Sequence, residues 1–444
     1  MNKKTIILGA AFLIILIILL IILSSRNTKP TTDNTTKEQI KLIWWNLFEP
    51  EENVKSLIDS YTASNPNIQI QYQQMGLDGI SAYKDRLISE LNDQDILTSP
   101  DIFPISNFWN GSFEKSIVQS PTTVFSTTDL SDLYPIIKQD FYKGGKLSAM
   151  PLYMDGLAVI YNKDRLKEIG LTVPNKNWSD FQSEAQRLTV KDSGGKIIKP
   201  GFSAYIFDNT QFAFDTLNLI MLQNGVKFYD AAGKRLKLET QPEALNALQF
   251  YDYFVSNQLD TWDKDQKSDI VSFLEGRLAM YIAPSWRIIN ILNYNKEYNL
   301  NLNIGVSKIP QVIGAQEMSW PLYWGLSVSK DCRYPEEAWK FIKYMTQAEQ
   351  LRKLNSNIIK NGRPIGIIYP RLSMIKDIEN DPYLGAYANS LLNATDWNMF
   401  DYDLMKAAFK RNLAEGIDLV KLDNVIDGVL NTKSLVSPTP TPIT

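Results

Sequence analysis

The sequence contains no histidine and a single cysteine, Cys332, among its 444 residues. Without imidazole, the chain can form neither a Ser-His-Asp nor a Cys-His nucleophile system, and no histidine-ligated zinc site. One cysteine cannot form a disulfide within the chain or a cluster of metal-binding thiolates. We therefore expect no catalytic residues, no metal site and no cofactor.

The sequence also lacks an excess of either charge. Lys and Arg number 46 against 49 Asp and Glu, which gives a formal net charge of -3. Proteins that bind nucleic acids need a basic surface to neutralise phosphates, so we expect no nucleic-acid partner. The hydrophobic share of 44% and the charged share of 21% are ordinary for a globular protein. The length is sufficient for two lobes with separate cores.

The N-terminus carries one long apolar run, residues 6–23, directly after Lys3 and Lys4. As a helix this run would span roughly 27 Å, close to the hydrocarbon thickness of a bilayer. It ends at Ser24 without the small-residue pattern of a cleavage site. We expect residues 1–23 to be an uncleaved anchor that holds the chain on the extracytoplasmic face of the membrane. Cleavage and secretion is the alternative.

Polar segments flank the folded part of the chain. Residues 24–39 are rich in Thr, Asn, Ser and charge, and we expect a flexible tether there. Residues 436–444 form a Pro/Thr tail that we expect to be disordered.

Between these segments, strand and helix patterns alternate. Residues 40–45 are a short apolar run typical of a buried strand, and residues 68–72 alternate as a second strand. Between them, apolar residues at helical spacing predict a helix with one buried face: Val54, Leu57, Ile58 and Tyr61. This order predicts an α/β architecture with mainly parallel sheets.

Two further helices have predictable starts. Ser179 and Gln182 match a capping box, followed by the apolar stripe Phe181, Ala185 and Leu188. Pro335 is a favourable first residue for a helix whose apolar face is Ala338, Phe341, Ile342 and Met345.

Seven groups of short stretches along the chain carry a resemblance to a known family, and they follow one another in the order in which that family has them. They are residues 40–45; 99–103; 149–153; 157–164; 169–174 with 178–181; 273–280 continuing to 285–286; and 324–330 with 335–342. Together they resemble the extracellular solute-binding proteins of ABC importers, in the group that contains the maltose-binding protein. The resemblance covers about residues 40–430.

This resemblance implies a two-lobed fold like that of periplasmic binding proteins, with a mainly parallel sheet flanked by helices in each lobe and a ligand cleft between the lobes. Matching positions place residues 40–154 and 308–345 in lobe one, and residues 155–307 and 346–435 in lobe two. Hinge crossings would fall near Tyr153, near Ile309 and after Met345. The resemblance also implies a monomer that closes on a small-molecule carbohydrate and delivers it to the permease subunits of an ABC importer.

The resemblance implies ligand contacts at eleven positions, where aromatic rings would face the C–H side of a sugar and polar groups its hydroxyls. They are Trp44, Trp45, Asn107, Trp109, Asp155, Asn209, Trp286, Tyr323, Trp324, Arg363 and Trp397. Trp286 matches the family's stacking tryptophan, and Asp155 is the expected hydroxyl-binding carboxylate. Because strand side chains alternate, one of Trp44 and Trp45 should face the core.

Other prominent residues have plainer interpretations. We expect Trp178 and Trp339 to pack in the core, the acidic run 49–52 to be solvated, and Cys332 to have no role. Two alternatives to sugar capture stay open. The same fold could bind a peptide, a polyamine or a phosphorylated compound. A glycoside hydrolase could use paired carboxylates without histidine, although no such pair is marked in the sequence. We expect a binding protein and not an enzyme.

Overall fold

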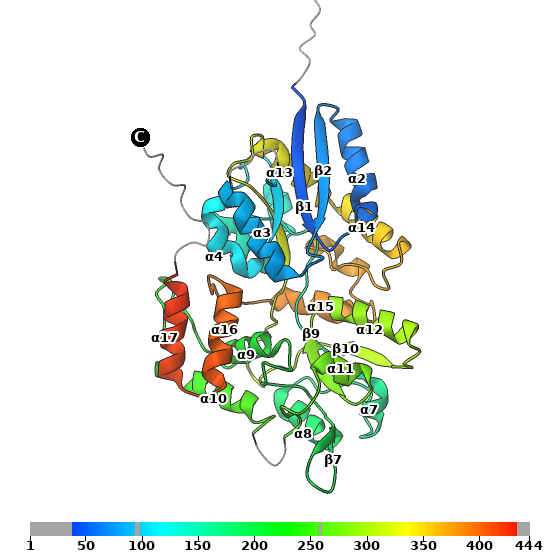
Figure 1. Ribbon diagram of the computed structural model, residues 1–444, viewed down its shortest axis with the longest axis vertical. Helices are drawn as coiled ribbons and strands as arrows, with labels where there is room; N and C mark the ends of the chain where they lie inside the picture. Colours follow the sequence, from blue (N-terminus) through cyan, green and yellow to red (C-terminus); the bar gives the residue numbers. More distant parts are fainter. Residues whose placement is uncertain (1–37, 94–97, 257–259, 433–444) are drawn as a thin grey trace, which may run out of the picture. The chain divides into compact units, whose positions relative to one another are not determined.

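The computed structural model describes residues 38–93, 98–256 and 260–432 (Figure 1). The predicted anchor at residues 1–23, most of the predicted tether and the predicted tail at 436–444 lie outside the described residues. Within the described part, no helix has both the length and the apolar character needed to cross a membrane.

The first sheet has four strands in the order β11-β3-β1-β2. Their bounds are β1 (Ile40–Leu47), β2 (Ile68–Met75), β3 (Ile102–Ser106) and β11 (Trp324–Val328). Strand β1 runs parallel to β3, with Trp44 opposite Ile102. Strand β11 runs antiparallel to β3, with Trp324 opposite Ser106. The C-terminal end of β3 and the N-terminal end of β11 therefore lie at the same edge.

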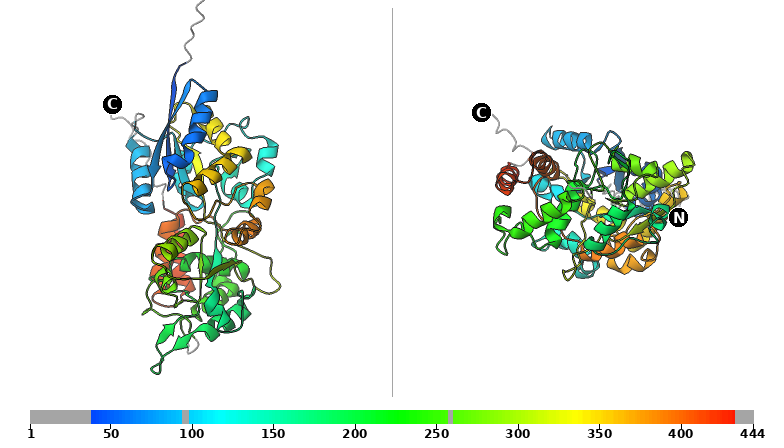
Figure 2. Two further views of the ribbon diagram at one scale, coloured as in Figure 1. Left: turned by 90° about the vertical axis from the view of Figure 1, so that its right-hand side faces the viewer. Right: turned by 90° about the horizontal axis from the view of Figure 1, so that it is seen from below.

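Helices cover both faces of this sheet, as Figures 1 and 2 show. Their bounds are α2 (Glu51–Ser64), α3 (Ile80–Asp93), α13 (Pro335–Met345) and α14 (Ala348–Lys360). Trp44 packs against Phe341 of α13, whereas its neighbour Trp45 packs against Tyr83 of α3. Because adjacent strand side chains point to opposite faces, α13 and α3 lie on opposite sides of the sheet. The predicted apolar faces of α2 and α13 are both buried, which confirms them.

The second sheet has three strands in the order β10-β6-β9, with bounds β6 (Ala158–Asn162), β9 (Met280–Ala283) and β10 (Ile304–Ser307). Both pairs are antiparallel, with Ala158 opposite Ala283 and Val159 opposite Ser307. The α/β class is confirmed, but the expectation of a mainly parallel sheet is wrong here. Strand β6 runs away from residues 150–157, through which the chain enters this lobe, whereas β9 and β10 both run back toward those residues.

Eight helices surround the second sheet or pack on its neighbours: α7 (Lys163–Lys167), α8 (Trp178–Leu188), α9 (Ala213–Gln223), α10 (Pro242–Asp252), α11 (Asp269–Leu274), α12 (Trp286–Glu297), α16 (Tyr402–Leu413) and α17 (Leu419–Leu430). Helix α8 begins earlier than predicted, because the Asn177 side chain accepts a hydrogen bond from the Asp180 N–H at 2.9 Å. The capping box at Ser179 is therefore wrong, whereas the stripe Phe181, Ala185 and Leu188 is buried as predicted.

Short elements complete the described chain. They are α4 (Asn110–Phe113), α5 (Thr127–Ser131), α6 (Pro135–Phe141), α15 (Gly385–Ser390), β4 (Tyr142–Lys143), β5 (Lys146–Leu147), β7 (Val190–Lys191), β8 (Ile197–Lys199) and five 3-10 turns at Asn107–Trp109, Glu114–Ser116, Leu238–Thr240, Leu372–Asp377 and Leu391–Asn393. Trp178, Trp339 and Cys332 are buried, and burial raises the pKa of the Cys332 thiol.

Two antiparallel segments connect the sheets, and we call residues 150–157 and 320–326 the crossing ribbon. At one end, Met150 and Leu326 exchange backbone hydrogen bonds of 3.0 and 2.9 Å. At the other end, the Leu322 N–H donates to the Asp155 carbonyl at 2.9 Å, and the Leu157 N–H donates to Trp320 at 3.0 Å. The first of these segments contains Tyr153, near which a crossing was expected. Ile309 precedes the second segment, and its neighbour Gln311 donates a backbone hydrogen bond to Lys176 of the second lobe at 2.8 Å, so we propose to move that crossing to residues 320–326.

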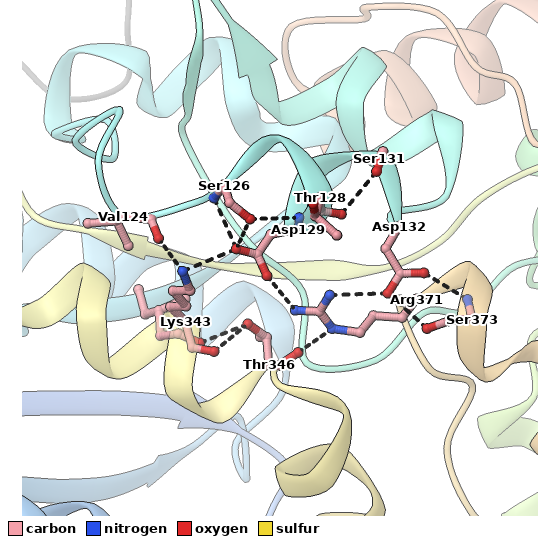
Figure 3. A network of polar contacts seen from close by, with 11 residues as sticks. Val124, Ser126, Thr128, Asp129, Ser131, Asp132, Lys343, Thr346, Arg371 and Ser373 are labelled. Atoms are coloured by element: carbon pink, nitrogen blue, oxygen red, sulfur yellow. Dashed lines mark hydrogen bonds and ion pairs between the residues drawn. The ribbon is translucent and has the colours of Figure 1, made fainter.

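The segment after Met345 stays with the first sheet. Helix α14 packs against α2, and Asn357 of α14 donates a hydrogen bond to the Asn53 carbonyl at 2.8 Å. Further along, Arg371 reaches between Asp129 and Asp132 at the end of α5 (Figure 3). Its Nε donates to the Thr346 carbonyl at 2.6 Å. We therefore propose to place residues 346–373 in lobe one, with the third crossing near Ala394, which pairs with Ser319.

Candidate functional site

The register of the second sheet brings Asp155 and Ser285 together. Asp155 precedes β6 and Ser285 follows β9, and Ala158 lies opposite Ala283. Asp155 Oδ1 accepts hydrogen bonds from the Gly156 and Ser285 N–H groups at 2.8 and 2.9 Å, and Oδ2 accepts one from Ser285 Oγ at 2.9 Å. Burial raises the pKa of Asp155 to about 6, against the opposing effect of these donors. Asp155 thus holds the start of α12 in place.

Trp286, the first residue of α12, presents an exposed ring beside Asp155. All ten tryptophans lie in the described residues, and Trp286, at 40%, is the most exposed of them. Its ring lies edge to face with Phe212 at 6.0 Å, and the guanidinium carbon of Arg287 is 4.6 Å from the ring centroid. A fixed, half-exposed indole is a suitable platform for the apolar face of a ligand.

A buried ion pair lies at the end of β1. Glu49 is 1% exposed, and Arg363 Nη1 donates to Glu49 Oε1 at 2.6 Å. The interpretation of residues 49–52 as a solvated run is therefore wrong for Glu49, because this partner 314 positions away takes up its charge. The neighbouring Phe48 is 48% exposed and has a φ of 63°, a conformation that is rare for a bulky residue and is concentrated at functional sites.

Tyr153 on the crossing ribbon connects these two groups electrostatically. Burial raises the pKa of the Tyr153 hydroxyl, and the carboxylates of Glu49 and Asp155 raise it further, while Arg363 opposes them. The hydroxyl therefore lies within electrostatic range of both groups. We call Glu49, Tyr153, Asp155, Ser285, Trp286, Arg287 and Arg363 the crossing cluster. It combines an exposed ring with carboxylate, hydroxyl and guanidinium groups.

Three other predicted site residues gather around Tyr83 of α3 in the first lobe. The Trp45 and Trp109 rings lie 6.5 and 6.4 Å from the Tyr83 ring, and Trp324 lies 4.9 Å from Trp109. Trp45 and Trp109 are buried, and only Trp324 is partly exposed. Trp44 is buried on the opposite face of β1. Both members of the Trp44–Trp45 pair thus pack in the core, one on each face.

Asn107 and Tyr323 contact two neighbouring carboxyl groups, Asp140 and Asp396, which are each partly buried. Asn107 Nδ2 donates to Asp396 Oδ2 at 3.0 Å, and the Tyr323 hydroxyl donates to Asp140. Asp140 and Asp396 lie close enough to each other for the charge of Asp396 to raise the pKa of Asp140. Burial raises the pKa of both, that of Asp396 to about 6. We call Asp140 and Asp396 the carboxyl pair.

Asn209 and Trp397 have structural roles. Asn209 Nδ2 donates to the Asp263 and Gln266 carbonyls at 2.9 and 3.2 Å, and its Oδ1 accepts from Trp262 Nε1 at 2.7 Å. Trp397 is buried and stacks on Phe228 with 3.9 Å between the ring centroids. Both side chains therefore have packing roles within the second lobe, and a ligand contact at either position stays a prediction.

A buried lysine, which sequence reasoning missed, joins α3 to α16. Lys84 Nζ lies 2.9 Å from Asp401 Oδ2 and 2.7 Å from Asp403 Oδ2. The side chains of Lys84 and Asp401 are 10% and 0% exposed. Lys84 Nζ also lies 4.7 Å from the Trp109 ring centroid. Among the residues that the structure describes, no group of acidic or sulfur side chains could hold a metal ion.

Comparisons with known proteins agree with this architecture. Residues 46–351 match the model of the family described as bacterial extracellular solute-binding protein. The probable ABC transporter-binding protein of Deinococcus radiodurans is 23% identical over 301 residues, covering 66% of this chain and 68% of that protein. The multiple sugar-binding protein of Streptococcus mutans is 22% identical over 340 residues, covering 72% and 73%.

Solved structures show the same two-lobed fold. The cyclic alpha-maltosyl-1,6-maltose binding protein from Arthrobacter globiformis superposes with a TM-score of 0.71 at 16% identity, covering 88% of this chain and 99% of that one. The sugar-binding protein MalE from Xanthomonas citri gives 0.70 at 18% identity, covering 88% and 97%. Because the family match spans more than half of the sequence, this chain belongs to the bacterial extracellular solute-binding proteins.

Proposed function

We propose that this protein captures a carbohydrate outside the cytoplasmic membrane and delivers it to an ABC importer by hinge closure. The observation that carries the proposal is Trp286, a half-exposed indole fixed at the start of α12 beside the Asp155 carboxylate. An aromatic face for C–H groups and polar side chains for hydroxyls are the chemistry that a sugar requires. Relatives named for sugar binding or for ABC transport support the same assignment.

The crossing ribbon supports the hinge component. Residues from both sheets flank the ribbon, so a ligand held at the crossing cluster would contact both lobes. Such contacts favour a closed form over an open one, because only differential binding shifts a conformational equilibrium. We further propose that the chain acts as a monomer, that permease subunits recognise its closed form, and that residues 1–23 anchor it.

We also propose that the protein does not hydrolyse its ligand. A glycosidase separates its two carboxyl groups by roughly 5–10 Å to act on a bond between them. The two groups of the carboxyl pair are instead close neighbours, and Asn107, Gln139 and Tyr323 already donate hydrogen bonds to them. Oligosaccharides incubated with the protein should therefore be recovered intact. Turnover would contradict this proposal.

The test of carbohydrate capture is a thermal-shift screen followed by titration calorimetry. A ligand that binds only the folded state raises the melting temperature, so sugars should do so where amino acids, peptides and polyamines do not. Trp286→Ala should weaken binding of the best sugar by about 1–3 kcal/mol, the loss of one aromatic contact. Tyr294→Ala is the matched control, because Tyr294 lies on the same helix and is 42% exposed. Unchanged affinity in Trp286→Ala would contradict the assignment.

A further inference from the structure

Arg287, the second residue of α12, is a buried cation without a paired carboxylate. Its side chain is 9% exposed, and it lies over the Trp286 ring. Its Nε is buried and has no hydrogen-bond partner. Among the described residues no carboxylate lies within ion-pair distance of its guanidinium, in contrast to Arg363 and Arg371. A buried charge that lacks a partner is unfavourable, so packing alone does not account for Arg287.

Two carboxylates lie near the start of α12, Asp269 and Asp155, and both already accept hydrogen bonds. Asp269 is close enough for the Arg287 charge to lower its pKa, although burial raises that pKa more. The two Asp269 oxygens accept hydrogen bonds from the Gln211 and Ile270 N–H groups at 2.9 and 2.6 Å. Asp155 is likewise engaged with Ser285 and Gly156. Neither carboxylate is free to form a bidentate pair with the guanidinium.

The position of Arg287 in the helix is also unfavourable for a cation. Helix α12 has twelve residues, and the partial positive charge at its N-terminus favours anions in the first turn. The first turn of α12 contains no acidic residue and one arginine. Asp155 already supplies a negative group to this N-terminus through Ser285, so it is the unpaired guanidinium that favours a further negative group next to the exposed ring.

We propose that the ligand stacked on Trp286 is a carbohydrate bearing an anionic group, a carboxylate or a phosphate, and that Arg287 selects for it. The guanidinium donates paired, charge-assisted hydrogen bonds to the anion while the indole contacts the sugar ring. A neutral sugar leaves the cation unmatched, so the site discriminates against it. This inference rests on the proposed carbohydrate function and adds a ligand class to it.

The test compares matched neutral and acidic sugars by titration calorimetry. The probes are glucose, glucuronate and glucose 6-phosphate, followed by galactose and galacturonate oligomers of equal length. We expect an acidic member to bind at least tenfold more tightly than its neutral counterpart, and the two acidic arms identify whether carboxylate or phosphate is preferred. Arg287→Gln should abolish this ratio, because it weakens binding of the acidic sugar more than binding of the neutral one. Arg287→Lys should retain part of it and serves as a second variant if glutamine impairs folding.

Arg277→Gln is the matched control, because Arg277 lies in the same lobe but pairs with Glu275 at 2.8 Å. In this variant, the ratio of the affinity for the acidic sugar to that for the neutral sugar should equal the ratio in the unaltered protein. The inference is overturned if neutral sugars bind as well as acidic ones, or if Arg287→Gln weakens both equally, which would mark Arg287 as a support for the Trp286 ring. Failure of every sugar to bind is a different result, and it would remove the carbohydrate function itself.

Discussion

The ion pair between Lys84 and Asp401 allows a quantitative test of how α3 and α16 are held together. Lys84→Met removes the charge while keeping a long apolar side chain over the Trp109 ring. The Asp401 carboxylate remains with no exposed surface and without its cation. It keeps two backbone donors, the Asp403 and Leu404 N–H groups at 3.0 and 3.1 Å, because it caps α16.

The magnitude follows from this geometry. Removing one partner of a buried ion pair costs about 3–5 kcal/mol, since the remaining charge is left unpaired. The capping hydrogen bonds still stabilise the Asp401 carboxylate, so we place the loss at the lower end, about 3 kcal/mol. Asp403 contributes little to this figure, because its side chain is half exposed.

Urea unfolding followed by tryptophan fluorescence measures this change. The control is Lys55→Met, which removes an ion pair to Asp59 whose side chains are 62% and 59% exposed. That substitution should change the free energy of unfolding by less than about 0.5 kcal/mol, as is usual for exposed pairs on a helix. If Lys84→Met also costs under about 1 kcal/mol, the buried pair does not hold the two helices together, and the reasoning fails.

Two further predictions concern stability. The folded carboxyl pair retains a proton that the unfolded chain releases near pH 4, so its contribution to stability falls as pH rises from about 4 to 7. Asp396→Asn should reduce that fall by at least about 1.4 kcal/mol, the equivalent of one pKa unit. The same dependence of the unfolding free energy on pH in both proteins would refute this prediction. Gly201→Ala should cost more than about 2 kcal/mol in denaturant unfolding, because a Cβ there would lie 1.8 Å from the Ala185 carbonyl. The control Gly428→Ala in α17 meets open space and should stabilise by about 0.5–1 kcal/mol, and equal effects would contradict the clash.

Local patterns in the sequence were sufficient to predict the elements of the first lobe. The apolar spacing in α2 and the proline that opens α13 depend only on neighbouring residues, and both are confirmed. The cap of α8 was placed two residues late because Asn177 and Ser179 are both good capping residues. The structure resolves the choice by burying Trp178 inside the first turn.

Strand direction in the second sheet could not be predicted from the sequence. Short apolar runs such as residues 158–162 and 280–283 carry no information on which way the chain returns. More than a hundred residues separate β6 from β9, and a connection of that length allows either strand direction. Only the assembled fold shows that both β9 and β10 end beside the start of β6.

The sequence indicated those members of the candidate site that can be recognised from a single residue and its neighbours. It did not indicate pairs of charged residues that are far apart in the chain. Trp286 and Asp155 were identified individually, and the register of the sheet explains their proximity. Glu49 and Lys84 resemble ordinary surface charges until Arg363 and Asp401 are placed beside them. Trp44, Trp45 and Trp109 show the opposite problem, because a large aromatic residue is equally suited to a core.

The crossing ribbon limits how the two sheets can turn. Its ends are fixed by the hydrogen bonds at Met150 and Leu326 and at Leu157 and Trp320. Between those ends, the described backbone of residues 151–154 and 323–325 forms no hydrogen bond from one segment to the other. We therefore expect rotation of the two sheets relative to each other to be concentrated in these residues, close to Tyr153. A ligand bound at Trp286, as we propose, would lie near that pivot, because Asp155 of the crossing ribbon is hydrogen-bonded to Ser285; a small rotation there would be amplified at the far rims of the two lobes.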